Sequence, residues 1–176
     1  IQTCRLGIEW ARAEPQEGVF DECAISRIKE EIMLMSALGI RPLIMLQGFS
    51  VPMWFEEKGG WLEQDNVRCF LIYVERVISR IGHLCSEFLT LNEPNVYAYN
   101  GYMLGLWPPG MKSMNAAFTV MSNMATAHIK AYRLIHDMRR SMGFHDTKVS
   151  SAIGMRAFVP KSSGNPLDRR SAATAE

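Results

Sequence analysis

The sequence predicts an α/β fold in which four parallel strands and the helices between them form part of a (β/α)8 TIM barrel. Short apolar segments alternate with amphipathic helical patterns, which predicts right-handed crossovers and a parallel sheet. A doubly wound nucleotide-binding fold usually has a Gly-rich turn after its first strand, but this chain has Trp10-Ala11-Arg12-Ala13 there. With 176 residues, the chain is shorter than the ~250 residues of a full barrel. We therefore expect residues 1–176 to form a single, partial barrel domain.

The first strand is expected at residues 5–10, and Pro15 and Gly18 mark the loop after it. Asp21 is a suitable N-cap for a helix that stops at Gly39. Apolar residues at spacings of three and four predict one buried stripe along this helix: Ile25, Ile28, Ile32 and Met35.

The second unit repeats this plan. We expect a strand at residues 40–46, a long loop at 47–60 and a helix closed by Gly82. The helix carries a stripe of seven apolar residues: Val67, Phe70, Leu71, Val74, Val77, Ile78 and Ile81.

The third strand, residues 88–91, is followed by a long loop at 95–113 and by a helix that ends near Gly143. We expect its buried stripe to consist of Phe118, Met121, Ala125, Ile129, Tyr132 and Ile135. A fourth strand is expected at residues 148–153, then a loop at 159–166 and the first turn of another helix.

Composition narrows the class of partner. The chain is 48% hydrophobic and has a net charge of +1. It contains no long run of charges of one sign, which argues against electrostatic binding of nucleic acid or anionic lipid. No apolar run approaches the ~20 residues that span a bilayer. Its four cysteines and four histidines lack metal-ligand spacing, so we expect buried free thiols in a reducing compartment, no metal and no cofactor. Together these features favour a cytoplasmic protein with a small-molecule partner.

Glu93 is the first candidate catalytic residue. It follows an apolar strand in the run Thr90-Leu91-Asn92-Glu93-Pro94 and therefore lies at the C-terminal mouth of the predicted barrel. Active sites of such barrels are built at that mouth, so Glu93 is a candidate general acid. The alternative is a solvated or salt-bridged carboxylate.

Four motifs carry a resemblance to a known family: residues 5–12 (RLGIEWAR), 52–61 (PMWFEEKGGW), 91–94 (LNEP) and 105–110 (GLWPPG). In this order and spacing they resemble glycoside hydrolase family 1, the β-glucosidases and 6-phospho-β-glucosidases. The resemblance covers essentially the whole chain. It implies barrel strands two to five, with the N-terminal and C-terminal parts of the barrel outside residues 1–176.

The resemblance also implies roles for individual residues. Retaining glycosidases use two carboxyl groups about 5 to 5.5 Å apart, a proton donor and a nucleophile. Glu93 matches the acid/base, Asn92 matches the residue that binds the sugar 2-hydroxyl, and Arg5 matches the arginine that holds the nucleophile ionised. Two alternatives stay open: Asn92 caps the loop, or Arg5 pairs with a structural carboxylate.

The nucleophile of the resembling enzymes lies in a Thr/Ser-Glu-Asn-Gly run, which does not occur in residues 1–176. Other carboxylates do not replace it. We expect Glu9 in a buried ion pair, and Glu56 and Glu57 in solvent. The chain by itself should not hydrolyse glycosides.

A further departure lies at the end of the second strand. The resembling enzymes carry a sugar-binding histidine where this chain has Gly48, and neighbouring Gln47 could compensate only through a bulge or a bent strand end. Asn95 stands where many members have tryptophan. Losing one polar contact made in the transition state costs ~1 to 3 kcal/mol, or up to about a hundredfold in rate.

Tryptophans are candidate platforms for sugar rings. Trp54 and Trp107 lie in the long loops above the mouth and are expected to contact substrate, whereas packing is the favoured role for Trp10 and Trp61.

Two classes of function remain. One is part of a retaining β-glycosidase that acts on a β-glucoside or oligosaccharide, with 6-phospho-β-glucosides as the alternative substrate. The other is a non-catalytic, sugar-binding remnant. In either case the open barrel edges are expected to favour self-association.

Overall fold

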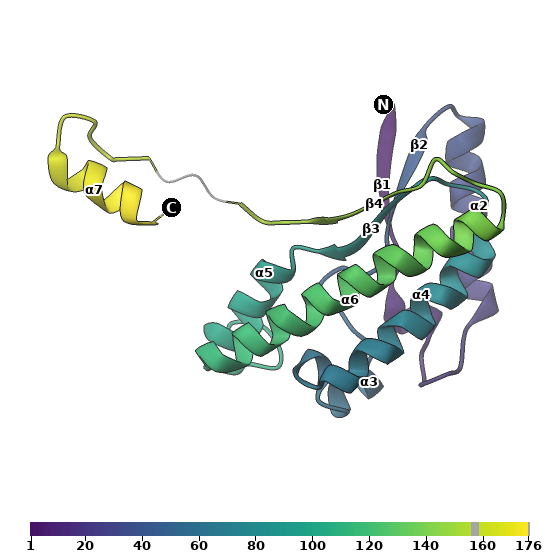
Figure 1. Cartoon of the computed structure of the whole chain (residues 1–176), viewed down its shortest axis with the longest axis horizontal. Coiled ribbons are helices and arrows are strands. Elements are labelled where there is room, and N and C mark those ends of the chain that lie inside the picture. The colour runs from purple at the N-terminus through teal and green to yellow at the C-terminus, as the bar shows by residue number, and fades with distance from the viewer. Residues whose placement is uncertain (156–158, 176) are drawn as a thin grey trace.

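The computed structural model describes residues 1–155 and 159–175 and confirms a partial barrel with four parallel strands (Figure 1). The strands are β1 (Thr3–Gly7), β2 (Arg41–Met45), β3 (Glu87–Asn92) and β4 (Lys148–Ala152), and they lie side by side in the order β1-β2-β3-β4. Each strand pairs in parallel with the next one along the chain. This sequential order lacks the reversal of a doubly wound sheet and is the order of a barrel wall.

Three long helices connect the strands: α2 (Glu22–Ala37), α4 (Val67–Ile81) and α6 (Met114–Ser141). As predicted, α2 is capped by Asp21, whose carboxylate accepts hydrogen bonds from the backbone N–H groups of Cys23 and Ala24 at 2.8 and 3.0 Å. Its Ile25 and Ile32 are buried, and all but one of the seven residues predicted for the α4 stripe are fully buried. The exception is partly buried Leu71.

The α6 helix forms as predicted, but its core face is not the predicted one. Phe118 is 64% exposed and Ile129 is 52% exposed. The buried face is made mainly of smaller residues: Ala116, Ala117, Val120, Asn123, Met124, Ala127, Ala131 and Ile135. Because α6 packs closely against α4 and the sheet, small side chains occupy the contact, and the larger apolar residues point away from it.

The first strand is shorter than predicted. It ends at Gly7, and Trp10 begins the short helix α1 (Trp10–Ala13) instead of ending the strand. The Trp10 indole is 1% exposed and donates a hydrogen bond to the Glu14 carboxylate at 2.7 Å. Its ring lies 4.8 Å from that of Phe55 and 5.0 Å from that of Tyr73, so Trp10 anchors an aromatic core under the loops.

Both long loops contain short helical elements that the sequence did not predict. Within the first loop lie α3 (Met53–Glu57) and the 3-10 turn η1 (Gly60–Leu62), and a second turn, η2 (Gln64–Asn66), leads into α4. The second loop holds α5 (Pro94–Ala98) and the π-helical turn η3 (Tyr99–Met103). These elements stand above the C-terminal ends of the strands and build the rim of the mouth.

The last helix, α7 (Pro166–Ala175), extends beyond the single turn predicted for it and lies away from the other helices in Figure 1. Within the described residues, β1 pairs only with β2 and β4 only with β3, so both outer strands have an unpaired edge. In the same part of the chain, no helix combines the length and apolarity needed to span a membrane.

Candidate active site at the C-terminal ends of the strands

Glu93 lies at the C-terminal end of β3, as the sequence predicted. Its backbone is left-handed, with φ 47° and ψ 55°, and among the described residues it is the only non-glycine with a positive φ. The Glu93 N–H donates to the Ala152 carbonyl at 2.8 Å, and the Glu93 carbonyl accepts from Val96 and Tyr97 at 2.9 and 3.0 Å. These bonds fix Glu93 between β4 and the first turn of α5.

Arg5 and Asn92 meet at the same end of the sheet. The Arg5 Nη1 atom donates to Asn92 Oδ1 at 3.0 Å, a contact that spans from β1 to β3 across β2. Asn92 is 7% exposed, and its backbone N–H donates to the Gln47 carbonyl at 2.9 Å. The described residues give Arg5 no carboxylate partner, and the Asn92 side chain does not cap α5.

Glu9 does not form the buried ion pair that we expected. Its side chain is exposed and accepts a hydrogen bond from the Ser50 hydroxyl at 2.7 Å. The reason is that the strand has already ended at Gly7, so Glu9 lies outside the sheet, directly before α1. Glu9 is therefore a second carboxylate at the rim.

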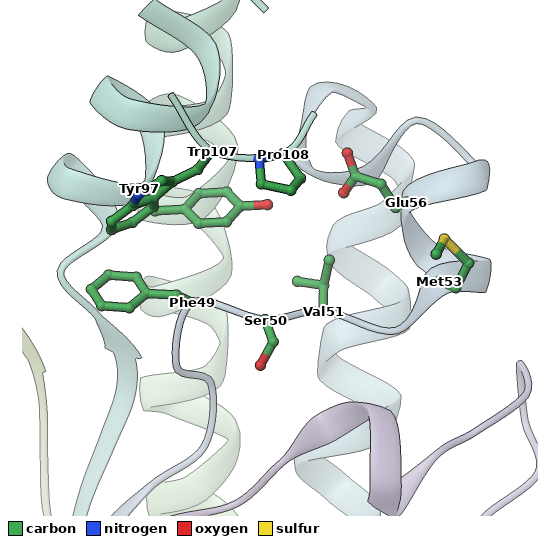
Figure 2. Close-up of a pocket in the computed structure, with 8 residues that line it drawn as sticks. All are labelled: Phe49, Ser50, Val51, Met53, Glu56, Tyr97, Trp107 and Pro108. Carbon is green, nitrogen blue, oxygen red and sulfur yellow. The ribbon is translucent and has the colours of Figure 1, made fainter. Parts of the chain in front are cut away.

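A pocket of about 520 Å³ opens between the two rim loops (Figure 2). Trp107 lines it and packs edge to face against Phe49, with ring centroids 4.9 Å apart. The complete lining is mostly apolar: Phe49, Ser50, Val51, Met53, Glu56, Tyr97, Trp107 and Pro108.

The expectation that Glu56 is fully solvated is wrong. Its carboxyl forms part of the pocket wall and packs against Gly60, where an added Cβ would lie 2.8 Å from Glu56 Oε2. Burial raises the pKa of Glu56, because the charged form loses hydration. Its neighbour Glu57 is exposed, as predicted.

The four tryptophans separate into two groups. Trp10 and Trp61 are buried in the aromatic core, which confirms their predicted packing role. Trp54 is not among the pocket residues: its indole N–H donates to the Glu14 carbonyl at 3.0 Å, and its ring packs against Trp10 with centroids 5.9 Å apart. Only Trp107, of the two tryptophans expected to contact substrate, lines the pocket.

Comparison with known proteins identifies this arrangement. The family model described as "Glycosyl hydrolase family 1" matches residues 1–176. The chain belongs to glycosyl hydrolase family 1. It is 28% identical over 163 residues to "Beta-glucosidase A" of Acetivibrio thermocellus, covering 92% of this chain and 35% of that protein. It is 26% identical to "Cytosolic beta-glucosidase" of Cavia porcellus, covering 97% and 37%.

Solved structures of the family agree. The "beta-glycosidase from Pyrococcus horikoshii" superposes with a TM-score of 0.84 at 35% identity, covering 97% of this chain and 38% of that one. The "Beta-glucosidase from Thermotoga maritima in complex with glucoimidazole" gives a TM-score of 0.87 at 25% identity, covering 98% and 38%. This family 1 chain thus spans little more than a third of the length of these four relatives.

Gly48 stands where the resemblance predicts a sugar-binding histidine, and the structure shows what surrounds it. An added Cβ at Gly48 would lie 3.6 Å from the Met45 methyl group, which is an ordinary contact distance. The side chain of Gln47 is completely buried, and neither polar atom of its amide has a hydrogen-bond partner among the described residues. Gln47 therefore does not extend into the open mouth, so it does not compensate for Gly48 in the way considered from the sequence.

The sequence did not reveal the partner of Asn95. Its side-chain amide donates to the Gly154 carbonyl at 2.6 Å and accepts from the Gly154 N–H at 3.1 Å. The two residues are 59 positions apart, so no local pattern links them. The only available signal was the unusual residue after the Asn92-Glu93-Pro94 run.

No group of three or more His, Cys, Asp or Glu side chains suited to a metal ion occurs in the part of the chain that the structure describes.

Proposed function

We propose that this chain supplies the acid/base half of a retaining β-glycosidase active site, with Glu93 as the proton donor. The observation that carries the proposal is the cluster at the strand ends: Arg5 and Asn92 are hydrogen-bonded at 3.0 Å, and Glu93 follows Asn92 directly. The family match over residues 1–176 supports these roles.

The chemistry requires a second carboxylate. In the first step that carboxylate attacks the anomeric carbon while Glu93 donates its proton to the glycosidic oxygen, so the alcohol leaves and a glycosyl ester forms. In the second step water attacks the anomeric carbon, Glu93 accepts its proton, and the sugar is released with retained configuration. Asn92 holds the sugar 2-hydroxyl, and Arg5 stabilises the ionised nucleophile.

We place the nucleophile outside residues 1–176, because the Thr/Ser-Glu-Asn-Gly run is missing from them. The β-glucosidases of Acetivibrio thermocellus and Cavia porcellus extend well beyond the matched segment, since this chain covers only 35% and 37% of their length. The chain alone is then inactive, and activity belongs to a polypeptide or complex that adds the remaining strands.

We propose β-glucosides as the substrate class. The names of the relatives support this, since two are β-glucosidases, and a related Thermotoga maritima enzyme was solved with glucoimidazole bound. Trp107 lines the pocket, which supports the proposal that it contacts the group attached to the sugar. For Trp54 we retain substrate contact as a proposal, through the exposed part of its ring, and 6-phospho-β-glucosides remain the alternative substrate.

A second candidate function is sugar binding without catalysis. The specific observation in its favour is Gly48, which leaves the sugar site without the family imidazole and without a substitute from Gln47. Under either function we propose self-association through the unpaired edges of β1 and β4. The expectation of buried thiols is wrong for Cys4 and Cys23, which are exposed, whereas Cys69 is partly buried and Cys85 is buried. All four thiols are free, which supports a proposed location in the cytoplasm.

Hydrolysis of phenyl β-glucoside, whose leaving group needs a proton, tests the proposal. The chain alone should give no turnover, and a polypeptide extended through the strand with the second carboxylate should be active. In that polypeptide Glu93→Gln should lower kcat/KM by about 10²- to 10⁴-fold, the usual contribution of a general acid. The control is Glu57→Gln, which alters an exposed carboxylate and should have no effect. Equal activity of the Glu93→Gln variant would contradict the proposal, and binding without turnover would favour the sugar-binding alternative.

A further inference from the structure

Glu93 has a left-handed backbone conformation, which residues other than glycine rarely adopt. A left-handed backbone is costly for a residue with a Cβ, and such residues persist where the surrounding structure holds them. One restraint is the hydrogen bond from the Glu93 N–H to the Ala152 carbonyl, at 2.8 Å. This bond connects Glu93 to the last residue of β4, so the position of Glu93 depends on the path that the chain takes after β4.

That path is fixed by Asn95. Two hydrogen bonds, at 2.6 and 3.1 Å, join its side-chain amide to the carbonyl and the N–H of Gly154. The Asn95 amide thus pairs with both backbone groups of Gly154, as a residue of a neighbouring strand would do in a sheet. The segment after β4 is therefore held to the first turn of α5, two residues beyond Glu93.

Gly154 lies directly beside the Glu93 carboxyl group. A Cβ at this position would be 3.5 Å from Glu93 Cδ, 3.7 Å from Glu93 Oε1 and only 2.5 Å from Val96 Cγ2. The absence of a side chain thus lets the backbone of Gly154 approach both residues. Gly154 forms a surface against which the Glu93 carboxyl packs.

We propose that Asn95 is a positioning residue for the acid/base: by pairing with Gly154, it sets the place and orientation of the Glu93 carboxyl. This inference rests on the proposed function of Glu93, but it assigns a role to a residue that contacts neither substrate nor the reacting atoms. The expected consequence of losing the pair is a misplaced proton donor in an otherwise intact site.

The test uses leaving groups of different acidity in the extended, active polypeptide. A phenol, with a pKa near that of tyrosine at about 10, needs proton donation to depart, whereas the far more acidic dinitrophenol does not. In Asn95→Ala, kcat/KM should fall about 10- to 100-fold for phenyl β-glucoside and less than about threefold for dinitrophenyl β-glucoside. Asn115→Ala, which alters an exposed asparagine on α6, is the matched control.

Gly154 provides an independent pair of variants. Gly154→Ala should show the same selective loss, because its methyl group would clash with Val96. Combining it with Val96→Ala removes the clashing atom and should restore most of the phenyl β-glucoside activity. Equal losses for the two substrates in Asn95→Ala, or no recovery in the double variant, would overturn the positioning role.

Two controls separate this inference from the proposed function. If Glu93→Gln itself loses both activities equally or neither, Glu93 is not the acid and the proposed function fails. In the 176-residue chain, hydrogen exchange of the Gly154 amide should accelerate at least about tenfold in Asn95→Ala. An unchanged exchange rate, with the expected behaviour of Glu93→Gln, would refute the role of Asn95 alone.

Discussion

Replacing Gly48 with histidine should strengthen sugar binding, because it places an imidazole where the resemblance to family 1 predicts a sugar-binding histidine. The structure has room for the change. An added Cβ would lie 3.6 Å from the flexible end of Met45, and Gly48 does not have the positive φ that would make a larger residue strained.

The size of the gain follows from these contacts. One hydrogen bond to a sugar hydroxyl contributes about 0.5 to 1.5 kcal/mol, or up to about 3 kcal/mol if the imidazole is charged. Glucose should therefore bind about 2- to 150-fold more tightly. Substituting glycine also restricts the unfolded chain, so the free energy of unfolding should not fall.

The assay is a calorimetric titration of the 176-residue chain with glucose, in parallel with kcat/KM for an aryl β-glucoside in the extended polypeptide. Gly164→His is the matched control, because an added Cβ there would meet nothing closer than Ser162 Oγ, at 4.0 Å, and Gly164 lies beyond β4, outside the strand ends. Unchanged glucose affinity and unchanged kcat/KM in Gly48→His would refute the reasoning. Such a result would mean that the end of β2 does not face the sugar.

Three further predictions concern stability and pH. Gln47→Met should raise the free energy of unfolding by about 1 to 3 kcal/mol in a urea titration, because it removes a buried amide that has no partner among the described residues; a decrease would show that the amide is satisfied. Arg139→Met should lower the free energy of unfolding by at least about 2 kcal/mol, because the buried guanidinium donates to the carbonyls of Gly82 and Cys85. A change within experimental error would contradict this prediction. Burial lowers the pKa of His128, so the unfolded chain binds more protons and stability should decrease as pH falls below about 6.5. His128→Asn should reduce this slope in melting temperatures recorded across pH, and an unchanged slope would exclude His128 as its cause.

Strand and helix positions were predictable where the sequence is locally periodic. The α4 stripe is an example, since nearly all of its predicted residues are buried. The pattern failed on α6, where Phe118 and Ile129 are exposed and Ala127 and Ala131 are buried. Hydrophobicity alone favours the larger residues, but the close approach of α6 to its neighbours selects small ones.

The site was predictable to the extent that one motif contains it. Glu93 lies at the end of β3 as expected, and the contact between Arg5 and Asn92 brings together two residues that were predicted separately. The pairing of Asn95 with Gly154 was not predictable, because it depends on how β3 and β4 end in space. The rim helices α3 and α5 were missed for a related reason: they are too short for a periodic pattern to appear.

The most direct test of the central claim is complementation. The rate of phenyl β-glucoside hydrolysis is measured for the purified 176-residue chain, before and after a second polypeptide with the remaining barrel strands and the proposed glutamate nucleophile is added. We predict no turnover before mixing, turnover after it, and its loss when the chain carries Glu93→Gln. Turnover by the chain alone, or activity of the mixture that does not depend on Glu93, would contradict the account.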